Sequence, residues 1–164
     1  MRHITDKGLA LIKGFEGFRP TIYRCPGDHP TIGYGHRLST EEQRRLRDGI
    51  SPEDADILLR HDVGVAEAAV TRYIRASLTD CQFDALVSFV FNVGPAAFAR
   101  STLCAKLNEG RYDAVPRELL RWVRSGGRTL PGLVRRRQAE ATLFTETPAA
   151  NAMKPGRVWP TDQK

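Results

Sequence analysis

Three side chains between residues 16 and 31 are of types that can perform acid–base chemistry. Glu16 lies between Phe15 and Phe18 in the sequence. A carboxyl group among aromatic and apolar groups is harder to ionise, so it can keep a proton near neutral pH and donate it, for example to a glycosidic oxygen. Most glutamates at helix ends are solvated surface residues, so the position alone does not establish this role.

Cys25 and Thr31 follow Glu16 at distances that let a hairpin bring all three together. A thiolate can act as a base or a nucleophile, although a thiol of ordinary pKa, about 8.5, is mostly protonated at neutral pH. Single cysteines are more often small buried apolar residues. Asp28 is the competing carboxylate, but an aspartate in a turn usually serves the turn itself. Cys25 and Asp28 therefore both remain candidates for the partner of Glu16.

A helix, a small sheet and then more helices are expected to position these groups. Thr5 or Asp6 can cap a first helix that ends near Gly17. Its buried side is predicted to consist of Leu9, Leu11, Ile12 and Phe15. Residues 20–38 contain β-formers around a Pro-Gly-Asp turn and predict an antiparallel hairpin or meander.

Two glycines mark the second half of that hairpin. Gly33 and Gly35 alternate with Ile32 and Tyr34, which leaves one face of the strand nearly bare. Glycine in a strand indicates either the close approach of a ligand or another backbone, or a bulge. These residues alone do not distinguish the two interpretations.

The remaining chain is predicted to be helical. Ser39, Ser51 and Thr79 each begin a capping pattern, and Gly94-Pro95 ends the strongly apolar helix that starts after Thr79. Further helices are expected at 101–108, 112–124 and 133–145. We predict an α+β fold with a small β-containing lobe at about 15–60, a helical lobe at about 61–146 that includes the first helix, and an extension at 147–164.

Composition fits a globular protein with an anionic partner. The 164 residues are 41% hydrophobic and 27% charged, with a net charge of +6. No apolar run reaches the length of a membrane span, and no export signal is expected in this chain. Three cysteines without a CxxC pair predict neither a structural zinc site nor a disulfide scaffold. The spacing of Arg117, Arg121, Arg124 and Arg128 predicts one basic stripe on a helix.

The motifs together resemble the phage-type lysozymes, or endolysins, of glycoside hydrolase family 24. The resemblance rests on Gly14-Phe15-Glu16-Gly17-Phe18-Arg19, Tyr23, Thr31-Ile32-Gly33-Tyr34-Gly35-His36, Phe91-Asn92-Val93-Gly94, Phe98, Ser101-Thr102-Leu103, Trp122, Gly126-Gly127, Leu130-Pro131-Gly132-Leu133 and Arg135-Arg136-Arg137. These segments cover roughly residues 5–145 in the family's order. The family's spacing is Glu, eight residues, Asp, five residues, Thr. This chain has Glu16, Cys25 and Thr31 at those positions, so it departs from the pattern at Cys25.

The resemblance implies a lysozyme-like fold with the active site in a cleft between the two lobes. It implies hydrolysis of the β-1,4 bond between N-acetylmuramic acid and N-acetylglucosamine in bacterial peptidoglycan, without a metal or other cofactor. Glu16 would donate the proton, Cys25 would take the second catalytic role and Thr31 would position water. Phe91 and Ser101 match positions that line the saccharide cleft.

His36 ends the glycine-rich strand, where it can support Glu16 and contact the substrate. The alternative that the sequence leaves open is a histidine whose ring is satisfied by backbone groups. Resemblance to endolysins also implies a monomer made in the host cytoplasm that acts on the cell wall. It would reach the wall through a membrane lesion made by a separate holin-type protein, with its basic surface attracted to the anionic envelope.

Two alternatives remain open from the sequence. A lytic transglycosylase cleaves the same bond with one essential glutamate and forms an anhydro sugar, and the absence of the usual aspartate favours considering it. A non-enzymatic basic protein that binds the anionic envelope or nucleic acid would also explain the +6 charge. The sequence contains no helix-turn-helix, RNP or zinc-finger motif, so specific recognition of nucleic acid is not expected.

Overall fold

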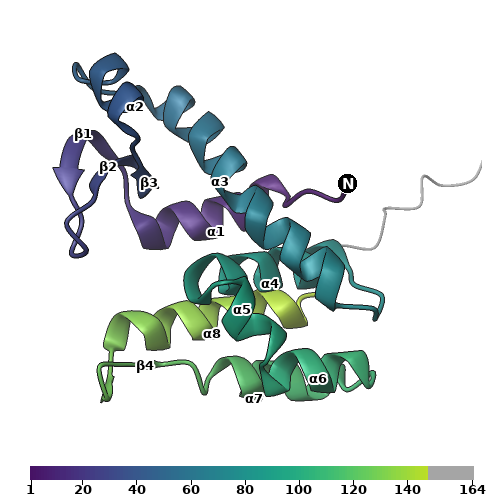
Figure 1. Ribbon diagram of the computed structural model, residues 1–164. Helices are drawn as coiled ribbons and strands as arrows, with labels where there is room; N and C mark the ends of the chain where they lie inside the picture. Colours follow the sequence, from purple (N-terminus) through teal and green to yellow (C-terminus); the bar gives the residue numbers. More distant parts are fainter. Residues whose placement is uncertain (148–164) are drawn as a thin grey trace, which may run out of the picture.

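The computed structural model describes residues 1–147, in which a three-stranded sheet stands beside a larger group of helices (Figure 1). The elements are α1 (Asp6–Glu16), β1 (Arg19–Arg24), β2 (Pro30–Gly33), β3 (His36–Arg37), α2 (Thr40–Arg45), α3 (Pro52–Tyr73), α4 (Asp80–Val93), α5 (Pro95–Ala99), α6 (Thr102–Asn108), η1 (Tyr112–Ala114), α7 (Val115–Leu119), β4 (Arg124–Ser125), β5 (Arg128–Thr129) and α8 (Pro131–Thr145). The α+β prediction is confirmed. No helix among these residues is both long enough and apolar enough to cross a membrane.

The start of α1 is fixed to the helical part by two buried carboxylates. The backbone N–H of Thr5 donates to Asp84 of α4 at 2.9 Å, and that of Ile4 donates to Glu67 of α3 at 2.8 Å. Gly8 permits this close packing, because a Cβ atom there would lie 2.6 Å from Asp84 Cβ. The N-cap at Thr5 and the end of the helix before Gly17 are both as predicted.

The three strands form an antiparallel sheet in the order β1-β2-β3. Tyr23 pairs with Thr31, and Thr31 in turn pairs with Arg37. Gly33 has a φ of +65°, and a Cβ atom there would lie 3.2 Å from Cβ of Ala55 in α3. This glycine therefore serves the close approach of a helix rather than of a ligand.

Helix α3 joins the sheet to the rest of the molecule. It begins after the Ser51 cap with Pro52 in its first turn, as predicted, and packs against β2 and β3 as well as α4 and α5. Figure 1 shows it running from the sheet down into the group of helices. One continuous helix thus crosses the boundary near residue 60 that the sequence suggested between the lobes.

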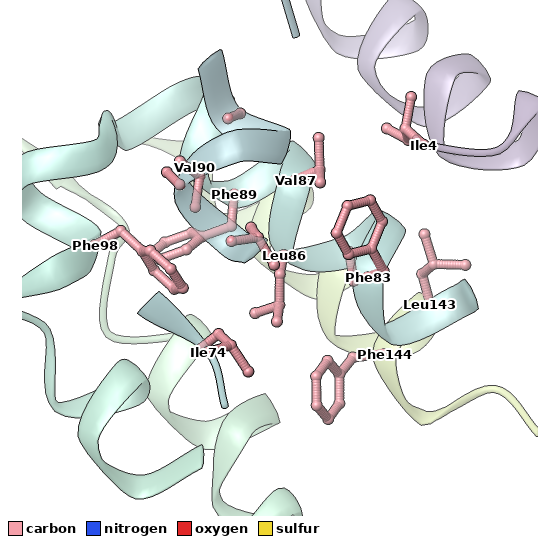
Figure 2. Packing of buried hydrophobic residues seen from close by; sticks show 14 of the residues in the cluster. Ile4, Ile74, Phe83, Leu86, Val87, Phe89, Val90, Phe98, Leu143 and Phe144 are labelled. Atoms are coloured by element: carbon pink, nitrogen blue, oxygen red, sulfur yellow. The ribbon is translucent and has the colours of Figure 1, made fainter. Parts of the chain in front are cut away.

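The core is built around α4, whose side chains from Phe83 to Val90 are buried on every face (Figure 2). The Phe89 ring meets Phe98 edge-on with ring centroids 6.3 Å apart, and meets Trp122 at 5.4 Å. Helix α8 packs along the other side of α4 and contributes Leu143 and Phe144 to the same cluster. Such continuous burial explains why α4 has an almost unbroken apolar sequence.

Two expectations from the sequence are wrong in detail. Residues 112–124 do not form one helix, because the chain turns at Leu119–Trp122 and then enters a hairpin whose tip, Gly126-Gly127, has positive φ angles. The four arginines therefore lie on α7, the following turn, β4 and β5, and not on one helical stripe. Gly94-Pro95 ends α4 as predicted, and Pro95 also starts a short helix, α5, that the sequence analysis did not predict.

Phe15 was expected in the core, but its exposed fraction is 37%. Leu11 is only partly buried, whereas Leu9 and Ile12 are buried as predicted. The proposed C-terminal extension, apart from Thr147 itself, lies outside the described residues.

Candidate active site

Glu16 is the last residue of α1 and faces the helical part of the molecule. Its side chain is 26% exposed, and its Oε1 accepts a hydrogen bond of 2.6 Å from Arg136 of α8. On the other side, a Cβ atom at Gly35 would lie 4.0 Å from Glu16 Oε2. Gly35 has a φ of +95° in the β2–β3 turn, so the absence of a side chain there leaves space beside the carboxylate.

The surroundings of Glu16 differ from the apolar setting that its sequence neighbours suggested. The guanidinium carbon of Arg136 lies 5.6 Å from the centroid of the Phe15 ring, and Phe18 instead packs against Tyr34 at 5.5 Å. A guanidinium group at hydrogen-bonding distance stabilises a negative charge on the carboxylate. Sequence reasoning missed this contact, and its only signal was the run Arg135-Arg136-Arg137 in the last helix.

Cys25 begins the turn between β1 and β2, where several groups stabilise a thiolate. The backbone N–H of His29 is the largest cause of a lowered pKa of the Cys25 thiol, and the N–H of Gly27, the Thr31 side chain and the charge of Arg37 lower it further. Partial desolvation opposes this effect. The turn itself is closed by hydrogen bonds from Cys25 N to His29 O at 3.1 Å and from Asp28 N to Cys25 O at 2.8 Å.

Thr31 is brought next to Cys25 by the register of β1 and β2. Its hydroxyl donates to the carbonyl of His29 at 2.8 Å, and the residue is 2% exposed. The single hydroxyl proton can be given to this carbonyl or to the Cys25 thiolate, and in either case the oxygen can still accept a hydrogen bond. This geometry suits a hydroxyl that holds a water molecule.

Asp28 lies at the tip of the same turn and points away from these groups. Its side chain is 87% exposed, and its nearest charged partner is Arg24 at 3.4 Å. It has a φ of +59°, which is characteristic of an aspartate that shapes a turn.

His36 lies between two carboxylates from different elements. Its Nδ1 is 2.8 Å from Asp62 of α3, and its Nε2 is 3.3 Å from Glu42 of α2. The ring thereby links β3 to both helices. Its predicted role in binding substrate stays a prediction, since both ring nitrogens already have partners.

Phe91 and Ser101 lie in the helical part. Phe91 is partly buried and packs against the core, while Ser101 caps α6 by accepting from Cys104 N at 3.1 Å and donates to Phe98 O at 2.7 Å. Ser101 also lines a surface hollow of about 470 Å³. The other residues that line it are Ala97, Arg100, Thr102, Glu118, Arg121 and Trp122. None of Glu16, Cys25 and Thr31 lines this hollow.

The environment of Cys25 predicts an unusually reactive thiol. Alkylation of each cysteine by iodoacetamide, followed by peptide mass spectrometry across pH, should give Cys25 a midpoint below that of free cysteine, about 8.5. Cys104 is the internal control, because burial raises the pKa of its thiol and it should react poorly in the folded protein. Thr31→Val should move the Cys25 midpoint upward. A midpoint for Cys25 equal to that of free cysteine would contradict this description.

The capping box at Ser39 predicts a stability change at acid pH. The hydroxyl and backbone N–H of Ser39, followed by His36, lower the pKa of Glu42 from 4.5 to about 2. The charged form of Glu42 therefore stabilises the fold above pH 4.5, and this contribution is lost as the pH falls from 4.5 to about 2. Glu42→Gln should lower the free energy of unfolding at pH 7 by about 1 kcal/mol and flatten its dependence in that range. Chemical denaturation at several pH values measures both effects. The exposed neighbour Glu41→Gln should change neither.

Comparison with known proteins identifies the family. The phage lysozyme family model matches residues 13–140. The endolysin of Acyrthosiphon pisum secondary endosymbiont phage 1 is 43% identical over 87% of this chain and 97% of its own length. The endolysin of Bacillus phage B103 is 41% identical over 93% of this chain, which spans 57% of that longer relative. A crystal structure of P22 lysozyme mutant L86M superposes with a TM-score of 0.82 at 32% identity, covering 89% of this chain and all of the other. The fold is therefore lysozyme-like, and the chain belongs to the phage lysozyme family.

Proposed function

We propose that this protein is an endolysin that hydrolyses the β-1,4 bond between N-acetylmuramic acid and N-acetylglucosamine in bacterial peptidoglycan. The match of the phage lysozyme family to residues 13–140 carries the proposal. At the finer level it is a member of glycoside hydrolase family 24 with cysteine in place of the usual catalytic aspartate. The protein is a glycosidase that causes lysis of the host cell.

Glu16 acts as the proton donor to the glycosidic oxygen. The proposal is supported by its place at the end of α1, with an open space beside Gly35 on one side and Arg136 on the other. As the bond breaks, the leaving oxygen takes the proton of Glu16, and a water oxygen bonds to the anomeric carbon. Glu16 must therefore be protonated when substrate is bound.

Cys25 and Thr31 act on the water. Thr31 accepts a hydrogen bond from it through its hydroxyl oxygen, whose own proton is given to the His29 carbonyl or to Cys25. The lowered pKa of the Cys25 thiol favours a thiolate, which stabilises or deprotonates the attacking water. The exposed position of Asp28 at the turn tip favours Cys25 for this role.

The helical part attracts the acidic envelope and the carboxylates of the substrate. Residues 95–145 contain ten Lys and Arg against four Asp and Glu, a net charge of +6 that equals that of the whole chain. Arg100 and Arg121 border the hollow that Ser101 lines, which makes this hollow a suitable place for an acidic group next to the glycan. Phe91 contributes an apolar surface and His36 holds the sheet that carries Thr31.

We extend the proposal to the biological setting, which the resemblance to endolysins suggests. The protein is made in the host cytoplasm, acts as a monomer on the cell wall, and depends on a separate holin-type protein to reach it. It uses no cofactor, and its basic charge gives only weak, salt-sensitive contacts with nucleic acid.

Replacing the proton donor should abolish lysis. Glu16→Gln is expected to reduce the clearing rate of chloroform-permeabilised Gram-negative cells by at least about 100-fold, the scale of a lost general acid, because glutamine has no proton to donate. Circular dichroism should show an unchanged fold. Substantial clearing by folded Glu16→Gln would refute the assignment.

The second catalytic group can be identified with two matched variants. Cys25→Ser should be nearly inactive and Asp28→Asn close to wild type, since only the former removes the thiolate beside Thr31. The reverse result would move the role to Asp28. Mass spectrometry of the wild-type products distinguishes the reactions, because hydrolysis gives reducing ends and a lytic transglycosylase gives anhydromuramic ends.

A further inference from the structure

Glu140 is a fully buried carboxylate that the proposed reaction does not use. It lies on α8 with none of its surface exposed. Its Oε1 accepts from the hydroxyl of Ser88 at 2.7 Å and from Arg136 Nε at 3.2 Å, and its Oε2 is 2.9 Å from Arg137 NH1. The contact with Arg137 is an ion pair without the alignment of a hydrogen bond. Burying a charge is costly, so a carboxylate in this position requires an explanation.

Arg136 connects this buried group to Glu16. Two different parts of its guanidinium group are used, since Nε donates to Glu140 and NH1 donates to Glu16 at 2.6 Å. A third donor, NH2, lies 3.3 Å from the backbone carbonyl of Ser88. Only 4% of Arg136 is exposed, so water screens its charge weakly. The two carboxylates therefore share one guanidinium ion from opposite sides.

This arrangement resolves a conflict in the chemistry of Glu16. A general acid must be protonated, whereas an unshared arginine beside it would favour the ionised carboxylate. We propose that Glu140 is a positioning residue that offsets the charge of Arg136, so that Arg136 can hold Glu16 in place while Glu16 still takes up a proton. The inference rests on the proposed role of Glu16 as proton donor.

The charged groups around Glu140 come from two helices. Arg136 and Arg137 lie on α8 itself, and α1 supplies Glu16 on the far side of Arg136. Helix α4 supplies no charge to these contacts, only Ser88 to Glu140 and Asn92 to Arg137. Burial raises the pKa of the Glu140 carboxyl, and Arg137, Ser88 and Arg136 act against that shift. Glu140 thus lies between two cations. Its negative charge offsets the positive charge that Arg136 presents to Glu16.

The test is the pH dependence of cell-wall clearing by three variants. Activity falls at high pH as the general acid loses its proton. Glu140→Gln should move this alkaline limb to lower pH by roughly 0.5 to 1 unit, because Arg136 then acts on Glu16 without an opposing charge. Arg136→Gln should move the limb to higher pH. The double variant Arg136→Gln/Glu140→Gln should fall between the two single variants. A purely structural role for Glu140 would lower the rate without moving the limb.

Glu67→Gln is the matched control, since Glu67 is also a buried glutamate but contacts the N-terminal segment. It should leave the limb in place. An unmoved limb in folded Glu140→Gln, or a shift to higher pH, overturns the inference. Should Glu140→Gln fail to fold, the comparison between Arg136→Gln and the double variant decides. The inference is overturned if activity falls at the same alkaline pH in both variants. It is supported if activity falls at a lower pH in the double variant than in Arg136→Gln.

A second measurement separates this inference from the proposed function. The carboxyl carbon of Glu16 can be followed by NMR in protein labelled with ¹³C-glutamate, using Glu16→Gln to identify the signal. Its titration midpoint should be lower in Glu140→Gln than in wild type. This readout requires no catalysis. Normal clearing by Glu16→Gln would therefore refute the role of Glu16 alone, and an unmoved midpoint would refute the role of Glu140 alone.

Discussion

The two guanidinium ions and the one carboxylate buried between α4 and α8 constrain the rest of the structure. Charged groups away from water must have partners, and Arg136, Arg137 and Glu140 find them only in one arrangement of the two helices. Ser88 and Asn92 place those partners one helical turn apart on α4. The apolar side chains around them could pack in more than one register of the two helices. These polar contacts form in only one register. Arg136 also has a partner outside these two helices, Glu16. The need of Arg136 for a charged partner therefore fixes the end of α1 as well.

The sequence predicted well those features that depend on near neighbours. The capping boxes at Ser39 and Thr79 both form, because a cap involves residues within four positions of each other. The pairing that places Thr31 beside Cys25 follows from a short hairpin with a recognisable turn. The prediction of one helix over residues 112–124 was wrong. The regular spacing of the arginines favoured a helix, while the decisive signal was the pair Gly126-Gly127 just beyond.

The environment of Glu16 could not be predicted in this way. Phe15 and Phe18 suggested an apolar pocket, but the group that contacts the carboxylate comes from Arg136, which is 120 positions away in the sequence. An arginine run on a helix normally indicates a solvated face, and only the packing of α8 against α4 shows that two of its members are buried. The resemblance to a family located the candidate residues without indicating the charges around them.

The attachment of α1 has a mechanical consequence. Asp84 and Glu67 hold its first residues and Arg136 holds its last, so the whole helix moves with the helical part. Thr31 lies in the sheet and Cys25 in the turn between β1 and β2, and the chain enters this hairpin through Gly17 with a φ of +72°. A breathing motion of the sheet would therefore change the gap between the proton donor and the water-binding groups, without disturbing the contact that holds the donor.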